Sequence, residues 1–271
     1  MQSSYKRQAV SGAVRGRRVA AAGLGLAFAL VMTGCGGSDE SAETAAAGQS
    51  PAASESTASE ASKQATPSAT AGSGSGESRA LTGEELAQVM SELNLDLELG
   101  GTLVEEDELK AATAQSVDAM REAEYTPCNP SEGTDLSKAS REAGMVALAI
   151  DGNDPVRPDS ISVLSWPDEQ PVIEEIEASK VQLAACPEFT LSVGGTTVSS
   201  STETVEMPQV GDASQAYLTR ASANGQTQTS LIMTAWSGSN SVQITLNEAD
   251  PVESVRYVTP ILEEVLHRLE G

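Results

Sequence analysis

The chain has 271 residues and a formal net charge of −23, which is spread unevenly along the sequence. Five of the 16 basic residues precede residue 19, whereas residues 80–271 hold 33 acidic and nine basic side chains, a net charge of −24. A field of this sign repels phosphate backbones and anionic headgroups, so we expect no nucleic-acid partner and no membrane binding through the domain surface. The same field suits cations or basic peptides, or simply keeps the protein soluble. Aromatic residues are only 3% of the sequence, which argues against stacking platforms for bases or sugars.

Residues 1–34 have the pattern of an export signal. A basic segment precedes an uncharged apolar stretch at residues 19–33, which is shorter than the roughly 20 residues that a membrane-spanning helix needs. Small residues and then Cys35 follow. This order resembles the bacterial lipobox, in which the thiol is diacylated and the signal is cut just before it, although Met32 stands where Leu is usual. We therefore predict residues 1–34 as a lipoprotein signal peptide and Cys35 as the lipidation site, with a free core cysteine or an uncleaved anchor as the alternatives.

Residues 35–79 comprise the lipidated cysteine and a segment of Ser, Ala, Thr, Gly and Glu without large apolar side chains. Such a composition cannot offset the entropy of ordering, so we predict a disordered linker with a root-mean-square span of about 35–40 Å. Two acyl chains anchor a protein stably. The predicted location is therefore the extracytoplasmic face of the cell membrane, reached by general secretory or twin-arginine export.

Four segments of residues 80–271 have the apolar spacing of helices, at residues 81–93, 106–123, 171–186 and 250–271. Thr82 and Glu85 have the spacing of a capping box, and Asp250 with Pro251 has the pattern of a helix start. Pro260 predicts a kink or a break in the last helix. The inward face of the third helix is predicted to consist of four apolar residues: Ile173, Ile176, Val181 and Ala184.

Between these helices the apolar period changes to two, which indicates strands. The strand candidates are residues 145–150, 161–166, 189–193, 196–208, 215–221, 227–236 and 241–247, and the letters SGSN between the last two predict a hairpin. The strands cluster between helices and do not alternate with them. This order favours an α+β fold with an antiparallel sheet and flanking helices over residues 80–271.

Cys128 and Cys186 are the only cysteines besides Cys35. An exported protein meets an oxidising compartment, so this pair predicts a disulfide, with two buried free thiols as the alternative. The bond would close a loop of 58 residues and stabilise the fold by about 4 kcal/mol in the chain-entropy model.

The sequence lacks the familiar catalytic and metal-binding motifs. His267 is the only histidine, and its place on the polar side of the last helix predicts a solvent-facing side chain. Hydrolase, phosphate-loop and zinc signatures are missing, so we expect no catalytic residues, no metal and no cofactor. Acidic residues concentrate at residues 105–108 and 151–159, but neither stretch has the EF-hand spacing, and solvated charges at a helix start and a turn explain both.

The layout of residues 80–271 resembles the extracellular sensor domain of the PknH-type receptor Ser/Thr kinases, a module also found in lipoproteins. The motifs that carry the resemblance are VQLAACPEFT at residues 181–190, the P-x-V-G-D step at residues 208–212 before QAYLTRA, and the hairpin at residues 231–246 that leads to the last helix. The resemblance implies an antiparallel sheet with packed helices, disulfides and a cleft for an unidentified ligand. This chain departs from it in having one possible disulfide where the family has two, and no kinase domain.

These features together predict a lipid-anchored extracytoplasmic binding or sensor-like module without catalysis. Its expected partners are the membrane, through the lipid anchor, and an unknown small ligand or envelope protein. Two alternatives remain: a cell-wall glycan hydrolase that uses paired carboxylates, and an accessory protein that docks on a membrane or wall complex.

Overall fold

The computed structural model describes residues 80–152 and 157–270. Within these residues nine strands form one sheet in the order β1-β3-β4-β9-β8-β7-β6-β5-β2, and all neighbours in this order pair antiparallel. The strands are β1 (Thr102–Val104), β2 (Glu124–Thr126), β3 (Gly144–Ile150), β4 (Asp159–Ser165), β5 (Glu188–Val193), β6 (Thr196–Val205), β7 (Ala213–Ala223), β8 (Gln226–Ser237) and β9 (Asn240–Asn247). The sheet confirms the predicted α+β class.

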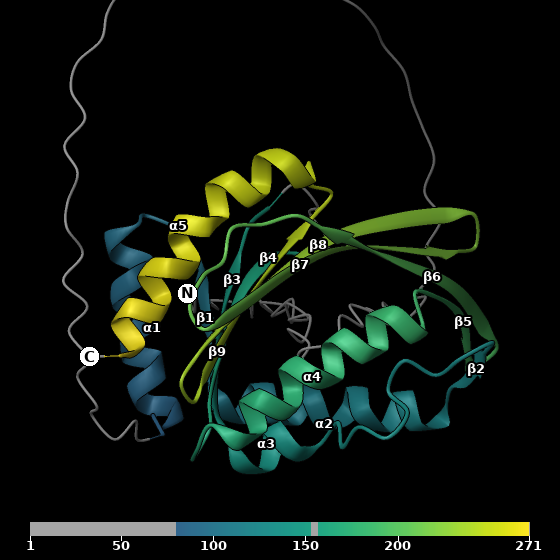
Figure 1. Cartoon of the computed structure of the whole chain (residues 1–271), viewed down its shortest axis with the longest axis horizontal. Coiled ribbons are helices and arrows are strands. Elements are labelled where there is room, and N and C mark those ends of the chain that lie inside the picture. The colour runs from purple at the N-terminus through teal and green to yellow at the C-terminus, as the bar shows by residue number, and fades with distance from the viewer. Residues whose placement is uncertain (1–79, 153–156, 271) are drawn as a thin grey trace, which may run out of the picture. The chain divides into compact units, whose positions relative to one another are not determined.

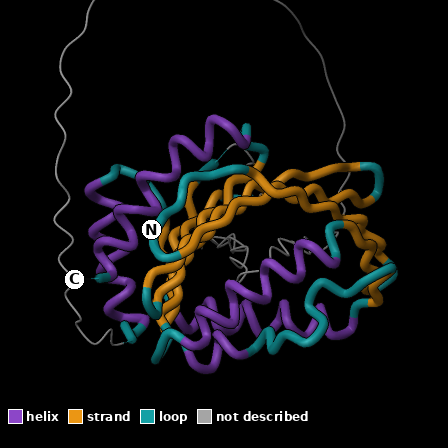
Figure 2. The backbone as a smooth tube through the Cα atoms, in the orientation of Figure 1, coloured by secondary structure: helices purple, strands orange, loops and turns teal. Residues whose placement is uncertain are grey.

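Five helices of the described residues flank this sheet: α1 (Gly83–Asp96), α2 (Glu106–Glu122), α3 (Lys138–Glu142), α4 (Gln170–Ala185) and α5 (Pro251–Leu269). Helices α1 and α5 cover one face, and α2, α3 and α4 lie on the other (Figure 1, Figure 2). The predicted capping box is present at α1, because the Thr82 side chain accepts from Glu85 N and the Glu85 side chain accepts from Thr82 N. The Asp250 side chain likewise caps α5.

The main hydrophobic core lies between the sheet and the pair α1 and α5. Leu86 and Leu93 of α1 and Leu262 of α5 are fully buried there against Leu231 and Met233 of β8. Since successive side chains of a strand point to opposite faces, Thr234 and Trp236 of β8 lie on the other face, below α4. This second face carries a smaller apolar cluster of its own.

The sequence-based helix and strand assignments need three corrections. Of the kink or break predicted at Pro260, the break is absent: α5 is continuous through Pro260, because Val258, Thr259 and Leu262 are buried and tertiary packing holds the helix together. The short elements β1, β2 and α3 have no counterpart among the sequence-based assignments, since segments of three to five residues show no clear period.

Three of the four residues predicted for the inward face of α4 are also wrong, whereas Ile176 is partly buried and packs against the smaller apolar cluster. Ile173 is 46% exposed and Val181 is 66% exposed, and Ala184 is exposed as well. The buried residues of this 16-residue helix are Val172 and Ser179. The face of α4 that packs on the sheet therefore centres on Val172 and Ser179, with Ile176 partly buried beside them.

None of the described helices is long and apolar enough to span a membrane.

Candidate functional site

A cavity of about 460 Å³ lies between α4, the end of β4 and the segment of residues 133–139 that leads into α3. Its walls are mostly apolar. The apolar side chains that line it are Leu136, Ala139, Leu164, Trp166, Pro171 and Ala178. A cavity of this size with apolar walls and a few polar groups has the character of a small-molecule site.

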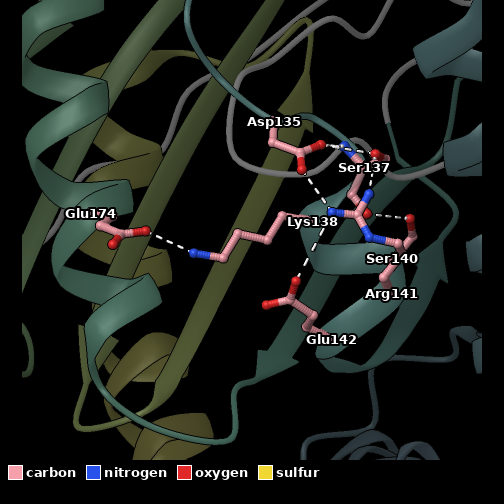
Figure 3. A network of polar contacts seen from close by, with 7 residues as sticks. All are labelled: Asp135, Ser137, Lys138, Ser140, Arg141, Glu142 and Glu174. Carbon is pink, nitrogen blue, oxygen red and sulfur yellow. Dashed lines mark hydrogen bonds and ion pairs between the residues drawn. The ribbon is translucent and has the colours of Figure 1, made fainter.

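Three charged side chains of the cavity lining are held by ion pairs. Lys138 Nζ lies 2.7 Å from Glu174 Oε2, so that this pair joins α3 to α4 (Figure 3). Asp135 Oδ2 lies 2.7 Å from Arg141 Nη2, and Asp135 Oδ1 accepts from Ser137. These donors lower the pKa of Asp135 to about 2, and the hydrogen bond from Lys138 lowers the pKa of Glu174.

Glu175, the fourth charged residue of the lining, has a different environment. Its Oε2 is completely buried and makes no hydrogen bond within the described part of the chain. Burial raises the pKa of Glu175 to about 7, while the indole N–H of Trp236 acts in the opposite direction without reaching a regular hydrogen-bond geometry. The cavity therefore contains a carboxyl group that changes charge near neutral pH.

Both tryptophans of the chain belong to the surroundings of this carboxyl group. Trp166 lines the cavity and Trp236 belongs to the same apolar cluster, and both are buried. The Nε1 atoms of both are buried without a hydrogen-bond partner among the described residues. Because a buried N–H without a partner costs free energy, these groups favour a bound molecule or water.

The predicted P-x-V-G-D step positions Trp236. Asp212 N donates to Trp236 O at 2.7 Å, and Gly238 N donates to Asp212 Oδ2 at 2.8 Å. Gly211 has φ +63°, and a Cβ atom there would lie 2.3 Å from Trp236 O. The motif thus holds the end of β8 in place, and with it the indole that faces Glu175.

Polar side chains form a row across the sheet beneath α4. Ser162, Gln243, Thr234 and Gln215 are neighbours in register on β4, β9, β8 and β7. Along its strand, each of these four lies next to a residue of the main core, which is on the α1 and α5 side of the sheet. Because successive side chains of a strand point to opposite faces, the four polar side chains lie on the face that α4 covers. Ser179 of α4 donates to Gln215 Oε1 at 3.0 Å. The hydroxyl oxygens of Ser162 and Thr234 are buried without hydrogen-bond partners in the described residues, so this face of the sheet is unusually polar.

None of the described residues singled out as sites in the sequence lines the cavity. Cys35, with the predicted signal peptide and linker, lies outside the described residues. Cys128 and Cys186 form the predicted disulfide, with a Cα–Cα distance of 5.9 Å, and Cys186 is the C-cap of α4. His267 is exposed on α5, as predicted.

The described residues of the two acidic stretches, residues 105–108 and 151–159, include carboxylates that stabilise the fold through an ion pair and a hydrogen bond. Glu106 lies in the first turn of α2, where Lys110 Nζ pairs with its Oε1 at 2.8 Å. Asp159 begins β4, and its Oδ1 accepts from Asn247 N at 2.8 Å. Among the described residues, no group of three or more His, Cys, Asp or Glu side chains has a metal-binding arrangement.

No family model matches the chain, and no curated protein matches it. The chain is similar to a solved structure described as the crystal structure of the extracellular domain of PknH from Mycobacterium tuberculosis. The TM-score is 0.43 and the identity is 9%, and the match covers 71% of this chain and 98% of that chain. This is the kind of domain that the sequence motifs resemble.

Sequence reasoning missed the residues of the cavity. Glu175 is one of many acidic residues, and the predicted inward face of α4 excluded it. Val172, Glu175 and Ser179 have the i, i+3, i+7 spacing of one helix face, so a face centred on Val172 would have contained the carboxylate. Nothing in the sequence indicated that Trp166 and Trp236 would both adjoin it.

Proposed function

We propose that this protein is a lipid-anchored extracytoplasmic module that binds a small ligand and has no catalytic activity of its own. The observation that carries the proposal is the cavity below α4, with apolar walls and buried polar atoms at Glu175 and Trp166 that lack partners among the described residues. Apolar walls supply affinity, and a few unpaired polar groups supply orientation and specificity. A sensor-like role, in which ligand binding is passed on to an envelope protein, fits such a module.

The same proposal places the protein at the extracytoplasmic face of the cell membrane. Its support is the sequence pattern of a basic segment, a short apolar stretch and Cys35, followed by 44 residues of linker composition at residues 36–79. The lipid on Cys35 would hold the protein at the membrane surface, and the linker would let the domain reach partners away from it.

The glycan-hydrolase alternative receives less support. Glu175, with its raised pKa, has the property of a general acid, but such an enzyme also needs a second carboxylate that is free to act. The other carboxylates that line the cavity, Asp135 and Glu174, each hold a basic partner. This arrangement favours binding over hydrolysis.

Native mass spectrometry of the full-length protein from its own cells tests the proposal. We expect a small molecule that co-purifies with the wild type and is lost in Ala178→Phe, because Ala178 lines the cavity. Ala184→Phe is the matched control, since Ala184 is exposed on the same helix. Equal retention of the ligand by both variants, or wall-glycan turnover that disappears in Glu175→Gln, would contradict the proposal.

A further inference from the structure

The charges of the cavity do not balance. Asp135 is paired with Arg141, and Lys138 is paired with Glu174. Glu175 is the only ionisable side chain of the lining without an opposite charge among the described residues. A buried carboxylate without a partner is unfavourable, so it either takes up a proton or binds a cation.

The groups around Glu175 define the complementary ligand. Its Oε2 can accept a hydrogen bond, and the indole N–H of Trp166 in the same lining can donate one. Trp166 belongs to the lining, and indole rings attract organic cations. Beyond the cavity, the net charge of −24 over residues 80–271 raises the local concentration of cations.

We propose that the cavity binds a small organic ammonium compound that also carries a hydrogen-bond-accepting oxygen. Glu175 is the counter-ion of the ammonium group, the Trp166 N–H donates to the oxygen, and Leu136, Leu164 and Pro171 contact the apolar part of the ligand. This inference rests on the proposed binding function and names its ligand class.

Calorimetric titration of the full chain in detergent micelles tests this inference with L-phenylalaninol, an amino alcohol that is protonated at neutral pH. Phenylpropanol, which lacks the amino group, is the neutral probe of the same shape. We expect phenylalaninol to bind more tightly than phenylpropanol. In Glu175→Gln its affinity should fall about ten- to a hundredfold, the range expected for a hydrogen bond to a charged group.

Glu177→Gln is the matched control, because Glu177 is an exposed residue of α4 and the variant has the same change in net charge. It should bind phenylalaninol as the wild type does. Circular dichroism of each variant reports whether the fold is retained.

The pH dependence of the wild type is a second measurement that needs no variant. Asp135, Glu174 and Lys138 face the cavity with Glu175, but the pKa values of the two carboxyl groups are lowered and that of Lys138 is raised. Of these four groups of the cavity lining, only Glu175 therefore changes charge near neutral pH, and the affinity for phenylalaninol should fall about tenfold between pH 8 and pH 6.

Three results would overturn the inference. Equal affinity for phenylpropanol and phenylalaninol, or unchanged affinity in Glu175→Gln, would remove the ammonium requirement and leave the proposed binding function standing. Failure of phenylalaninol to bind would also overturn it, and the co-purification experiment would then decide separately whether the cavity binds another class of ligand.

Discussion

At the scale of single residues, Glu175 links stability to function. The position holds a carboxyl group where an apolar side chain would pack without penalty, so the folded state is less stable than it could be when Glu175 is ionised. Binding sites are commonly built in this way, because a group that is poorly satisfied in the free protein gains most from a ligand. The same residue therefore predicts a pH-dependent stability.

Glu175→Gln should remove that pH dependence. The folded pKa of about 7 exceeds the ordinary value of 4.5, so the folded state binds the proton more tightly and stability falls as pH rises through this window. At about 1.4 kcal/mol per pKa unit, the wild type loses up to about 3 kcal/mol. The variant should be more stable than the wild type at pH 8 by up to this amount, with the difference shrinking toward pH 4.5.

Urea unfolding at pH 5 and pH 8 measures this effect, with Glu177→Gln as the control. An identical change in unfolding free energy for the wild type and both variants between the two pH values would show that Glu175 does not titrate in this window.

A second prediction at this scale concerns Gly211. Its φ of +63° disfavours a side chain, and a Cβ would lie 2.3 Å from Trp236 O. Gly225 has φ +77°, and a Cβ there would have nothing within 4 Å. A substitution at Gly225 therefore measures the free-energy cost of the positive φ alone, without a steric contact. We expect Gly225→Ala to cost about 1 kcal/mol and Gly211→Ala about 2–4 kcal/mol, since overpacking adds to strain. Urea unfolding of both variants measures the difference, and equal costs would contradict the close contact with β8.

At the scale of elements, α4 is held mainly by polar and covalent links. Lys138 joins it to α3, Gln182 donates to Thr134 Oγ1 at 2.8 Å, and Ser179 reaches the sheet. The disulfide at Cys186 fixes its C-terminal end. A helix attached in this way leaves space beneath it, which explains why the cavity lies here.

The attachment of α4 also explains where sequence reasoning fails. The capping box of α1 and the start of α5 can be predicted correctly because local hydrogen bonds determine them. The face of α4 cannot, because the usual assumption that apolar residues face inward does not hold for a helix that covers a polar row and a cavity. The site is hidden for the same physical reason, since its unpaired charged residue, Glu175, lies on a helix face where apolar residues are expected.

The disulfide should stabilise α4 more than the rest of the domain. In a variant with both Cys128→Ser and Cys186→Ser, the unfolding free energy should fall by up to about 4 kcal/mol, because the loop closed by the bond spans 58 residues. Hydrogen exchange followed by mass spectrometry should show faster exchange in α4, with α5 much less affected, since α5 packs on the main core. Equal acceleration in both helices would contradict a local role for the bond.

At the scale of the whole molecule, the fold class could be predicted and the position of the site could not. The longer strands, such as β3 and β8, contain apolar runs bounded by turn signals, a local property that the sequence displays directly. The row of Ser162, Gln243, Thr234 and Gln215 depends on the register of four strands, which only the folded structure defines. The cavity likewise draws its lining from three separate segments, α4, the end of β4 and residues 133–139, and therefore leaves little trace in any one of them.

The predicted anchor at Cys35 would place the cavity, and with it the proposed binding of a ligand, at the membrane surface. Two acyl chains hold a protein stably at a membrane, whereas the domain surface, with its net charge of −24 over residues 80–271, is repelled by anionic lipids. Cys35→Ser should therefore shift the protein from the detergent phase to the aqueous phase in a phase-separating detergent and abolish incorporation of labelled palmitate. The Cys128→Ser and Cys186→Ser variant, which retains Cys35, should remain in the detergent phase with its label. Membrane retention of Cys35→Ser would favour instead the alternative of an uncleaved anchor at residues 19–33, which is the longest uncharged apolar stretch before residue 80.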